Sequence, residues 1–340
     1  MQVNIESIKN ISNEILSKLG LPHYDAEIIV DTIIYAHQRG KATHGIGRMP
    51  IYARKIREGL MTAETNLCTI NDNSAISLYD AGHGFGQVAA YKGMMIAIEK
   101  ALQYGVGVVG VRHSNNFGTA GFFVELAAKN NMIGFIFANS PPAIAPTGGK
   151  IPIFGTNPIG IGFPGGHNKP AVVLDMATSI AARGKIRLAA KNGESIPIGW
   201  ALDGNGNPTT DPTEALKGSM IPIGGHKGFG LSLTVDVIAG LLTGAAFGGD
   251  VKPLNHERCL SDYGHLIMAI DIASFIDPAE YLDKMDYLTK RVKECGEENH
   301  VYLPGEHSFS LFNSDVVNVS DKQVNEINSL ARSLGIKELL

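Results

Sequence analysis

The chain has 340 residues, of which 44% are hydrophobic and 18% are charged, so it can bury a complete active site in one large domain or two intertwined lobes. This balance excludes a disordered chain, and a formal net charge of −4 without any long basic run argues against nucleic-acid binding. The three cysteines are far apart and form no CxxC, so they indicate neither a disulfide framework nor a thiolate zinc site and favour the cytoplasm.

The first 60 residues are predicted to be helical. Isoleucines recur at steps of three or four, and Gly20 then ends a predicted helix over residues 4–19. Two further helices are predicted over residues 24–39 and 43–58, each followed by a glycine. The amino terminus has no basic leader followed by an apolar block, so no signal peptide is expected.

Two residues in the third predicted helix, His44 and Arg48, suit the binding of an organic acid. If the chain is helical from Thr43, they share one face and lie one turn apart. A histidine, with a pKa of about 6.5, exchanges a proton near neutral pH. An arginine binds a carboxylate through two parallel hydrogen bonds. The alternative is a capped helix start with a solvated arginine.

A repeated pattern of buried strands and polar turns follows a region of predicted strands (64–80) and a predicted helix (86–104). The repeated strands are predicted at residues 105–111, 132–138, 158–164 and 171–177. In an open α/β sheet, ligands bind outside the carboxyl ends of strands, where loops present N–H groups and small polar side chains. The sequence therefore places the binding site in the turns that border these runs.

The first of these turns is the richest in polar groups. His113, Ser114, Asn115 and Asn116 directly follow the strand, and a helix beginning near Thr119 would offer free N–H groups to a phosphate or carboxylate. Glycines within the turn also allow the backbone to approach a ligand closely. The alternative is an ordinary glycine-rich connection between a strand and a helix.

Two further charged residues stand in apolar surroundings. Asp175 interrupts the run VVLDMA and needs a partner, which a ribose hydroxyl, a backbone N–H, Arg183 or Lys185 would supply. Lys227 precedes an apolar helix predicted over residues 228–246, and its position favours an anionic ligand at the helix start. Because this stretch contains an aspartate and several glycines, we expect a helix buried in the protein and no membrane span.

The rest of the chain contains few local signals. Residues 192–225 are predicted to be irregular, and they are followed by the apolar helix. The remaining predicted elements are a strand at 265–271, helices at 278–296 and 321–334, and a PGEH turn at 304–307. We divide the chain into a helical N-terminal segment (1–70), a cofactor-binding and substrate core (71–250) and a C-terminal segment packing back on the core (251–340).

Several common enzyme motifs are missing. No G-x-G-x-x-G follows a first strand, so an ordinary Rossmann fold is not expected. The eleven histidines form no HxxxH or HExxH motif, so no metal site is expected, and no G-x-S-x-G elbow marks a serine nucleophile.

Seven motifs together resemble the malate/L-lactate dehydrogenase family: THGIGR (43–48), SNNFGTAG, APTGG (145–149), FGTNP (154–158), LDMATS (174–179), GWALDGNGNPTTDP (199–212) and HKGFGL (226–231). The resemblance implies an α/β, mixed-sheet three-layer fold with helical N- and C-terminal segments, unlike an ordinary Rossmann fold. It further implies a cytoplasmic homodimer that uses NAD or NADP to oxidise 2-hydroxy acids or reduce 2-keto acids.

The same resemblance assigns roles to residues. His44 matches the family's acid/base histidine and Arg48 a substrate-binding arginine, while Thr156 falls in the GTNP loop near the site. The positions that match cofactor contacts are Ser140, Val172, Val173, Leu174, Asp175, Met176, Ala177, His226, Lys227, Gly305, Glu306 and His307.

One position departs from the family pattern. Many relatives carry a histidine, in some of them the proton acceptor, where this chain has Asn116. An amide forms hydrogen bonds but takes no proton at neutral pH, so the proton transfer is assigned to His44 and Asn116 is expected to steady the developing oxyanion.

Three alternatives remain at this stage. The first is a reductase of C=N bonds with the same fold, and the second is a cofactor-binding protein that has lost catalysis because of Asn116. The third is a metal-dependent hydrolase or lyase using His44, His113 and Asp175, which their lack of ligand spacing disfavours.

Overall fold

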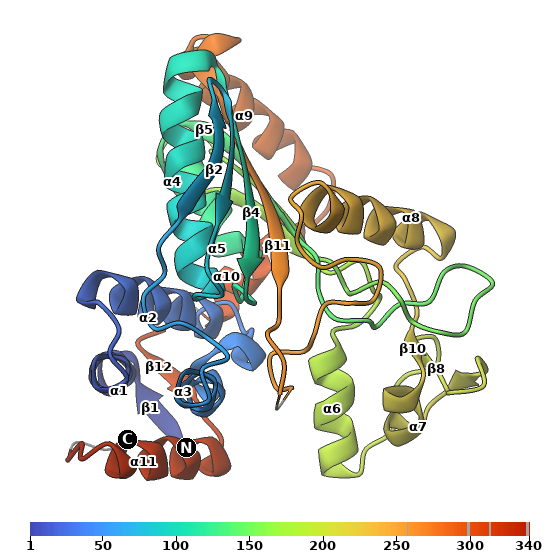
Figure 1. Ribbon diagram of the computed structural model, residues 1–340. Coiled ribbons are helices and arrows are strands. Elements are labelled where there is room, and N and C mark those ends of the chain that lie inside the picture. The colour runs from blue at the N-terminus through green and yellow to red at the C-terminus, as the bar shows by residue number, and fades with distance from the viewer. Residues whose placement is uncertain (257, 298–299, 313, 338–339) are drawn as a thin grey trace.

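The computed structural model describes residues 1–256, 258–297, 300–312, 314–337 and 340. A seven-stranded mixed sheet forms its centre, with strand order β2-β3-β4-β11-β5-β6-β7 (Figure 1). The strands are β2 (Cys68–Asn73), β3 (Ile76–Asp80), β4 (Val106–Ser114), β5 (Met132–Ala138), β6 (Ile159–Phe163), β7 (Val172–Met176) and β11 (Tyr263–Asp271).

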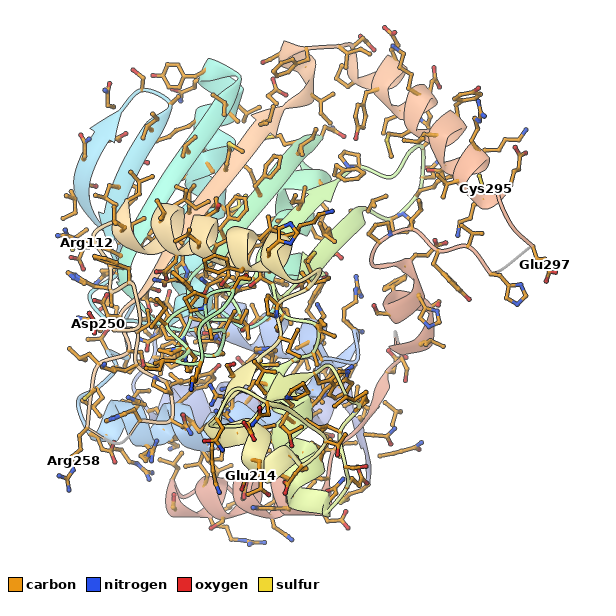
Figure 2. The ribbon with its side chains drawn as sticks, turned by 90° about the vertical axis from the view of Figure 1, so that its right-hand side faces the viewer. Arg112, Glu214, Asp250, Arg258, Cys295 and Glu297 are labelled. Carbon is orange, nitrogen blue, oxygen red and sulfur yellow. The ribbon has the colours of Figure 1, made fainter. Side chains whose placement is uncertain are left out.

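Helices cover both faces of this sheet. The helices α4 (Gly86–Tyr104) and α5 (Ala120–Lys129) pack on one face. On the other lies α8 (His226–Val235), continued by the π-helical turn η3 (Asp236–Leu241), which Figure 2 shows in front of the strands. The structure thus confirms the predicted three-layer α/β fold with a mixed sheet.

Strand direction brings the polar turns to one edge of the sheet. β3 is parallel to β4, whereas β11 is antiparallel to both β4 and β5, and β6 is antiparallel to both β5 and β7. The carboxyl ends of β3, β4, β5 and β7 therefore lie at the same edge. The loop before β6 reaches this edge as well, because β6 runs in the opposite direction.

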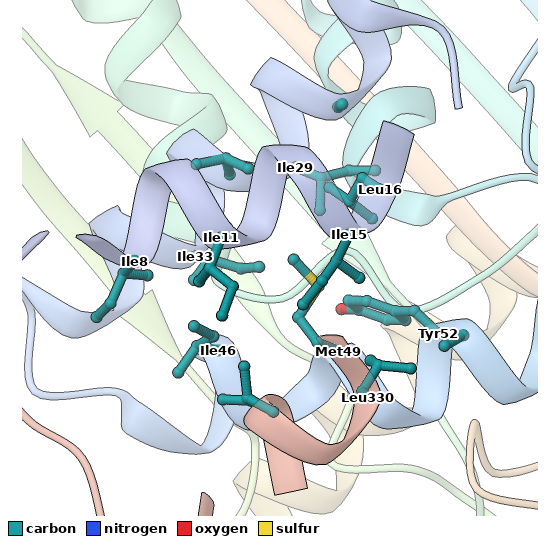
Figure 3. Packing of buried hydrophobic residues seen from close by; sticks show 14 of the residues in the cluster. Ile8, Ile11, Ile15, Leu16, Ile29, Ile33, Ile46, Met49, Tyr52 and Leu330 are labelled. Atoms are coloured by element: carbon teal, nitrogen blue, oxygen red, sulfur yellow. The ribbon is translucent and has the colours of Figure 1, made fainter. Parts of the chain in front are cut away.

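The N-terminal helices form a second core together with the end of the chain. α1 (Ile5–Lys18), α2 (His23–His37) and α3 (Met49–Arg57) pack with α11 (Asp321–Ser333), and β1 (Gln2–Asn4) pairs with β12 (Val316–Asn318). Figure 3 shows side chains such as Ile15, Met49 and Leu330 meeting in this core. Each fully buried aliphatic side chain contributes about 1.5–3 kcal/mol, so the early segment is firmly held.

α6 (Arg183–Asn192) and most of the region predicted to be irregular (192–225) build a small lobe with its own core. The lobe also contains β8 (Ala201–Leu202), β9 (Pro208–Thr209), α7 (Pro212–Lys217) and β10 (Ser219–Met220). In Figure 2 the labelled Glu214 marks α7 in this lobe, below α8. Two further helices are α9 (Pro278–Lys293), whose far end lies near Cys295 in Figure 2, and α10 (Glu306–Phe312), which begins inside the predicted PGEH turn at 304–307.

The strands and most helices lie within a few residues of their predicted positions, but the apolar helix does not have the predicted burial. Leu241 and Leu242 at its end are 52% and 64% exposed, and Phe247 beyond it is 48% exposed. Only the face toward the sheet, with Val235 and Ala239, is buried. The expectation of a fully buried helix was therefore wrong for this chain on its own. Among the described residues, no helix is both long and apolar enough to cross a bilayer.

Candidate active site

The segment that carries His44 and Arg48 is not one α-helix. Two short 3-10 turns, η1 (Ala42–His44) and η2 (Ile46–Arg48), precede α3, and extended Gly45 separates them. The predicted helix over residues 43–58 therefore begins six residues late, at Met49. His44 and Arg48 follow one another along a kinked segment, and they do not share a helical face.

A buried histidine explains this kink. The Gly45 backbone lies so close to His37 that a Cβ on it would come 2.4 Å from Nε2, and the next N–H, of Ile46, donates to the same nitrogen at 3.1 Å. Burial lowers the pKa of His37 to about 4, which keeps its ring neutral and able to accept this bond. Gly45 and His37 together direct the chain toward the sheet edge.

A salt bridge anchors the start of this segment to the sheet. Lys41 Nζ lies 2.6 Å from Asp175 Oδ2 at the end of β7, and the N–H of Gly121 in α5 donates to the same oxygen at 3.0 Å. These are the partners that Asp175 required. The predicted structural partners were wrong in one respect: Arg183 instead donates to backbone oxygens of Pro142 and Leu216.

A second contact anchors the segment to the small lobe. The methyl group of Thr43 lies 2.9 Å from the position of a Cβ on Gly184, so the first turn of α6 packs directly against it. The Thr43 carbonyl accepts a 2.8 Å hydrogen bond from Nε of Arg48. His44 is therefore held between two contacts, one to the sheet and one to α6.

The surroundings of His44 keep its ring uncharged. Burial is the main reason that the pKa of His44 falls to about 3, and the charges of Arg48 and Lys41 contribute to this shift. Its Nδ1 is buried and has no hydrogen-bond partner among the described residues. A neutral imidazole keeps one nitrogen lone pair, so it can accept a proton from a bound hydroxyl group.

The polar turn after β4 has an ordered internal network. Asn115 Nδ2 donates to the carbonyl oxygens of His83 and Gly84, at 2.9 and 2.8 Å. The side-chain oxygen of Asn116 accepts from the N–H of Gly118 at 3.1 Å, and its NH2 group donates to no other described residue. His113 is committed elsewhere, because its Nδ1 lies 2.7 Å from Asp80 Oδ2.

The GTNP loop joins three other elements at the same edge. Both the N–H and the hydroxyl of Ser140 point to Asn157 Oδ1, at 3.0 and 3.3 Å. The Thr156 carbonyl accepts from the N–H of Thr178, whose own carbonyl accepts from the N–H of Ile223, both at 2.9 Å. Ser140 and Thr156 are thereby tied to the connection that leads into α8.

The predicted cofactor-binding residues at 305–307, near the end of the chain, lie next to β7. The Val173 N–H donates to the Pro304 carbonyl at 3.0 Å, and a Cβ on Gly305 would lie 2.9 Å from the Val173 oxygen. Glu306 pairs with Lys293 at 2.6 Å, which together with a backbone N–H lowers its pKa against the effect of burial. The structure thus brings the 172–177 and 305–307 groups together.

The remaining predicted cofactor residues, His226 and Lys227, lie exposed at the start of α8. Within the described ranges, no three His, Cys, Asp or Glu side chains are grouped to hold a metal ion. Asp175 and His113 take part in separate pairs, so the geometry gives no support to the metal-dependent alternative.

Comparisons with known proteins agree with this architecture. The malate/L-lactate dehydrogenase family model matches residues 3–328. The L-sulfolactate dehydrogenase of Methanothermobacter thermautotrophicus is 41% identical over 339 residues, covering 99% of this chain and 98% of the relative. The malate dehydrogenase of Pyrococcus abyssi is 37% identical over 339 residues, covering 96% and 92%.

A solved structure extends the agreement to the fold. The sulfolactate dehydrogenase from Methanocaldococcus jannaschii matches with a TM-score of 0.92 at 36% identity, covering 99% of this chain and 98% of that one. The match over almost the full length defines an oxidoreductase with this mixed-sheet fold. The chain belongs to the malate/L-lactate dehydrogenase family, as its seven motifs predicted.

Sequence reasoning missed three residues that shape the site: Lys41, Thr178 and Gly184. Lys41 lies two residues before the first residue of the THGIGR motif, and nothing local distinguishes it from a solvated lysine. Thr178 lies inside the LDMATS motif, which was the one available signal for it.

Proposed function

We propose that this protein is an NAD(P)-dependent oxidoreductase that interconverts a 2-hydroxy acid of the malate or lactate type and its 2-keto acid by hydride transfer. The observation that carries this proposal is the double anchorage of residues 41–48. The Lys41–Asp175 pair and the contact between Thr43 and Gly184 hold a neutral imidazole and a guanidinium beside the polar edge of the sheet.

Each of three residues has a role that follows from its surroundings. Arg48 holds the substrate carboxylate, since its guanidinium makes only one hydrogen bond, through Nε, among the described residues. His44 takes the hydroxyl proton during oxidation and returns it during reduction. A carboxylate bound to Arg48 offsets one of the charges that lower the pKa of His44, so substrate binding makes His44 a stronger base. The free NH2 group of Asn116 steadies the substrate oxygen.

The edge also has features that fit a nicotinamide dinucleotide. Gly225 and Gly305 both have positive φ and no side chain, so the backbone at these two turns is accessible to a ligand at the sheet edge. Lys227 and the start of α8 provide positive charge for phosphates. The cofactor would be held by these residues with Ser140 and the 172–177 strand end, and when bound it supplies the hydride acceptor or donor.

The test is turnover of a panel of 2-hydroxy and 2-keto acids, followed through the near-ultraviolet absorbance of reduced nicotinamide. His44→Ala should lower kcat by about 10²- to 10⁴-fold with little change in cofactor affinity, because it removes the general base alone. The matched control is His167→Gln, an exposed histidine that pairs with Asp283 on α9. Equal turnover in His44→Ala and the parent would remove His44 from this role.

Asn116 supports a second candidate, a homologue with weakened catalysis. This reading predicts cofactor binding without turnover across the panel, and recovery of turnover in Asn116→His. Turnover of cyclic imino acids in place of keto acids would instead assign the protein to the C=N reductases.

We further propose that the protein is a cytoplasmic homodimer. Its three cysteines, Cys68, Cys259 and Cys295, are free, which supports a reducing compartment. The exposed apolar end of α8 and η3 supports contact with a second copy, since such surface is rarely left open. Leu242→Asp should yield monomers by light scattering, whereas Leu102→Asp, at an equally exposed position on α4, should not. Dimers in both variants would contradict a dimer contact through the end of α8 and η3.

A further inference from the structure

A second arginine, Arg187, lies on the helix that packs against the segment carrying Arg48. Arg187 lies in α6, three residues after Gly184, so the two positions share one side of the helix. Gly184 packs against Thr43, whose carbonyl binds Nε of Arg48. These contacts place the side of α6 that carries Arg187 next to the segment that carries Arg48.

The direction of the pKa shift of Arg187 agrees with this placement. Burial lowers the pKa of Arg187, and the charge of Arg48 lowers it further. Both charges also act on the hydroxyl of Tyr263, a buried residue at the start of β11. In Figure 1 the N-terminal helices and α6 both lie below the end of the sheet at which β11 begins.

No carboxylate neutralises this pair. Among the described residues, Arg187 forms no ion pair or hydrogen bond, and Arg48 bonds only to a backbone carbonyl. The closest acid at this edge, Asp175, is already paired with Lys41. Two like charges held together without a counterion cost free energy, which an anionic ligand would recover.

We propose that Arg187 binds a second acidic group of the substrate, so that the enzyme acts on dianionic 2-hydroxy acids in preference to monoanionic ones. Arg48 holds the carboxylate next to the reacting carbon, and Arg187 holds a carboxylate or sulfonate at the far end of a short chain. Arg187 is thus a specificity-determining residue, and this inference rests on the proposed function. Lactate, which lacks the second acid, leaves Arg187 without a partner.

The kinetic test compares malate with lactate in Arg187→Ala and Arg187→Lys. We expect Arg187→Ala to lower kcat/KM for malate by about 10- to 100-fold, mainly through KM, and to leave kcat/KM for lactate unchanged. Arg187→Lys should recover most of the loss, because the charge is kept. The control is Lys290→Ala, an exposed lysine on α9 that pairs with Glu294, which should change neither substrate. Equal losses for both substrates, or none for either, would overturn the proposal.

A binding measurement separates this proposal from the proposed function. Malonate, a dianion that undergoes no hydride transfer, should raise the melting temperature of the parent more than that of Arg187→Ala, because binding to the folded state stabilises it. A parent that turns over no 2-hydroxy acid but binds malonate through Arg187 would contradict the dehydrogenase function alone. Equal malonate effects in parent and variant would contradict the second anion site itself.

Discussion

Two groups of cations lie at the two ends of the segment that carries His44, and they differ in their partners. Arg39 pairs with Glu125 at 2.6 Å between the rings of Tyr35 and Phe309, and Lys41 pairs with Asp175. Arg48 and Arg187, at the other end, have no acidic partner among the described residues. Paired cations position the segment, whereas the unpaired cations are available to a ligand.

This difference separates stability from function. Removing one member of a paired group leaves a partly buried charge without a partner and should reduce stability. Removing an unpaired arginine takes away a repulsion, so it should harm substrate binding without harming the fold. Each prediction below tests one side of this contrast.

The largest effect is expected from Arg48→Ala. Loss of the guanidinium should lower kcat/KM for every 2-hydroxy acid by about 10²-fold or more, because a charged contact to the substrate carboxylate is worth roughly 2–5 kcal/mol. The melting temperature should stay the same or rise, since the charge next to Arg187 is gone. A large loss of stability in this variant would show that Arg48 is structural.

The reverse pattern is expected from Asp175→Asn. Lys41 then keeps its charge without a partner, and we expect about 1–3 kcal/mol less free energy of unfolding in urea, with lower kcat because the 41–48 segment is less firmly held. The control is Glu280→Gln, which breaks a solvent-exposed i,i+4 pair with Lys284 and should cost less than about 0.5 kcal/mol. Equal costs in the two variants would contradict an anchoring role for Asp175.

The pH dependence of stability tests the position of His44 between the two groups. Its pKa is about 3 in the folded protein and about 6.5 when unfolded, so the unfolded state binds more protons between these values. Stability contributed by the neutral ring is complete above pH 6.5 and declines as the pH falls toward 3, by up to about 1.4 kcal/mol per pH unit. Urea unfolding at several pH values should show a shallower decline in His44→Gln, and an unchanged decline would contradict a buried neutral ring.

The smallest effect is expected from Glu125→Gln. Arg39 loses its ion partner but keeps its contacts with both aromatic rings, so we expect a loss of roughly 1 kcal/mol in the free energy of unfolding. kcat/KM for malate should not change, because Arg39 is not one of the residues proposed to contact the substrate. A kinetic effect here would mean that Arg39 also contributes to the site.

The sequence predicted most elements because their signals are local. Alternating or continuous apolar runs marked β4, β5, β6 and β7, and the isoleucine spacing marked α1. The helix expected from Thr43 failed for a nonlocal reason, since His37 occupies the space beside Gly45 and bends the chain. No pattern within residues 43–58 records that contact.

The candidate site could be predicted as a set of residues but not as a geometry. The motifs selected His44, Arg48 and Asp175, yet the pairing of Lys41 with Asp175 joins positions 134 residues apart. The insertion of β11 between β4 and β5 is equally nonlocal. Residues 251–340 contribute β11, which is the middle strand of the sheet.

The pairing of β1 with β12 has a consequence for synthesis of the protein on the ribosome. The hydrophobic core that supports the early segment includes Val317, Ile327 and Leu330, so it cannot close until these late residues have been made. His44, the proposed proton-transfer residue, is therefore translated early but held in position only late. A nascent chain would remain inactive at least until the residues that complete this core have left the ribosomal tunnel.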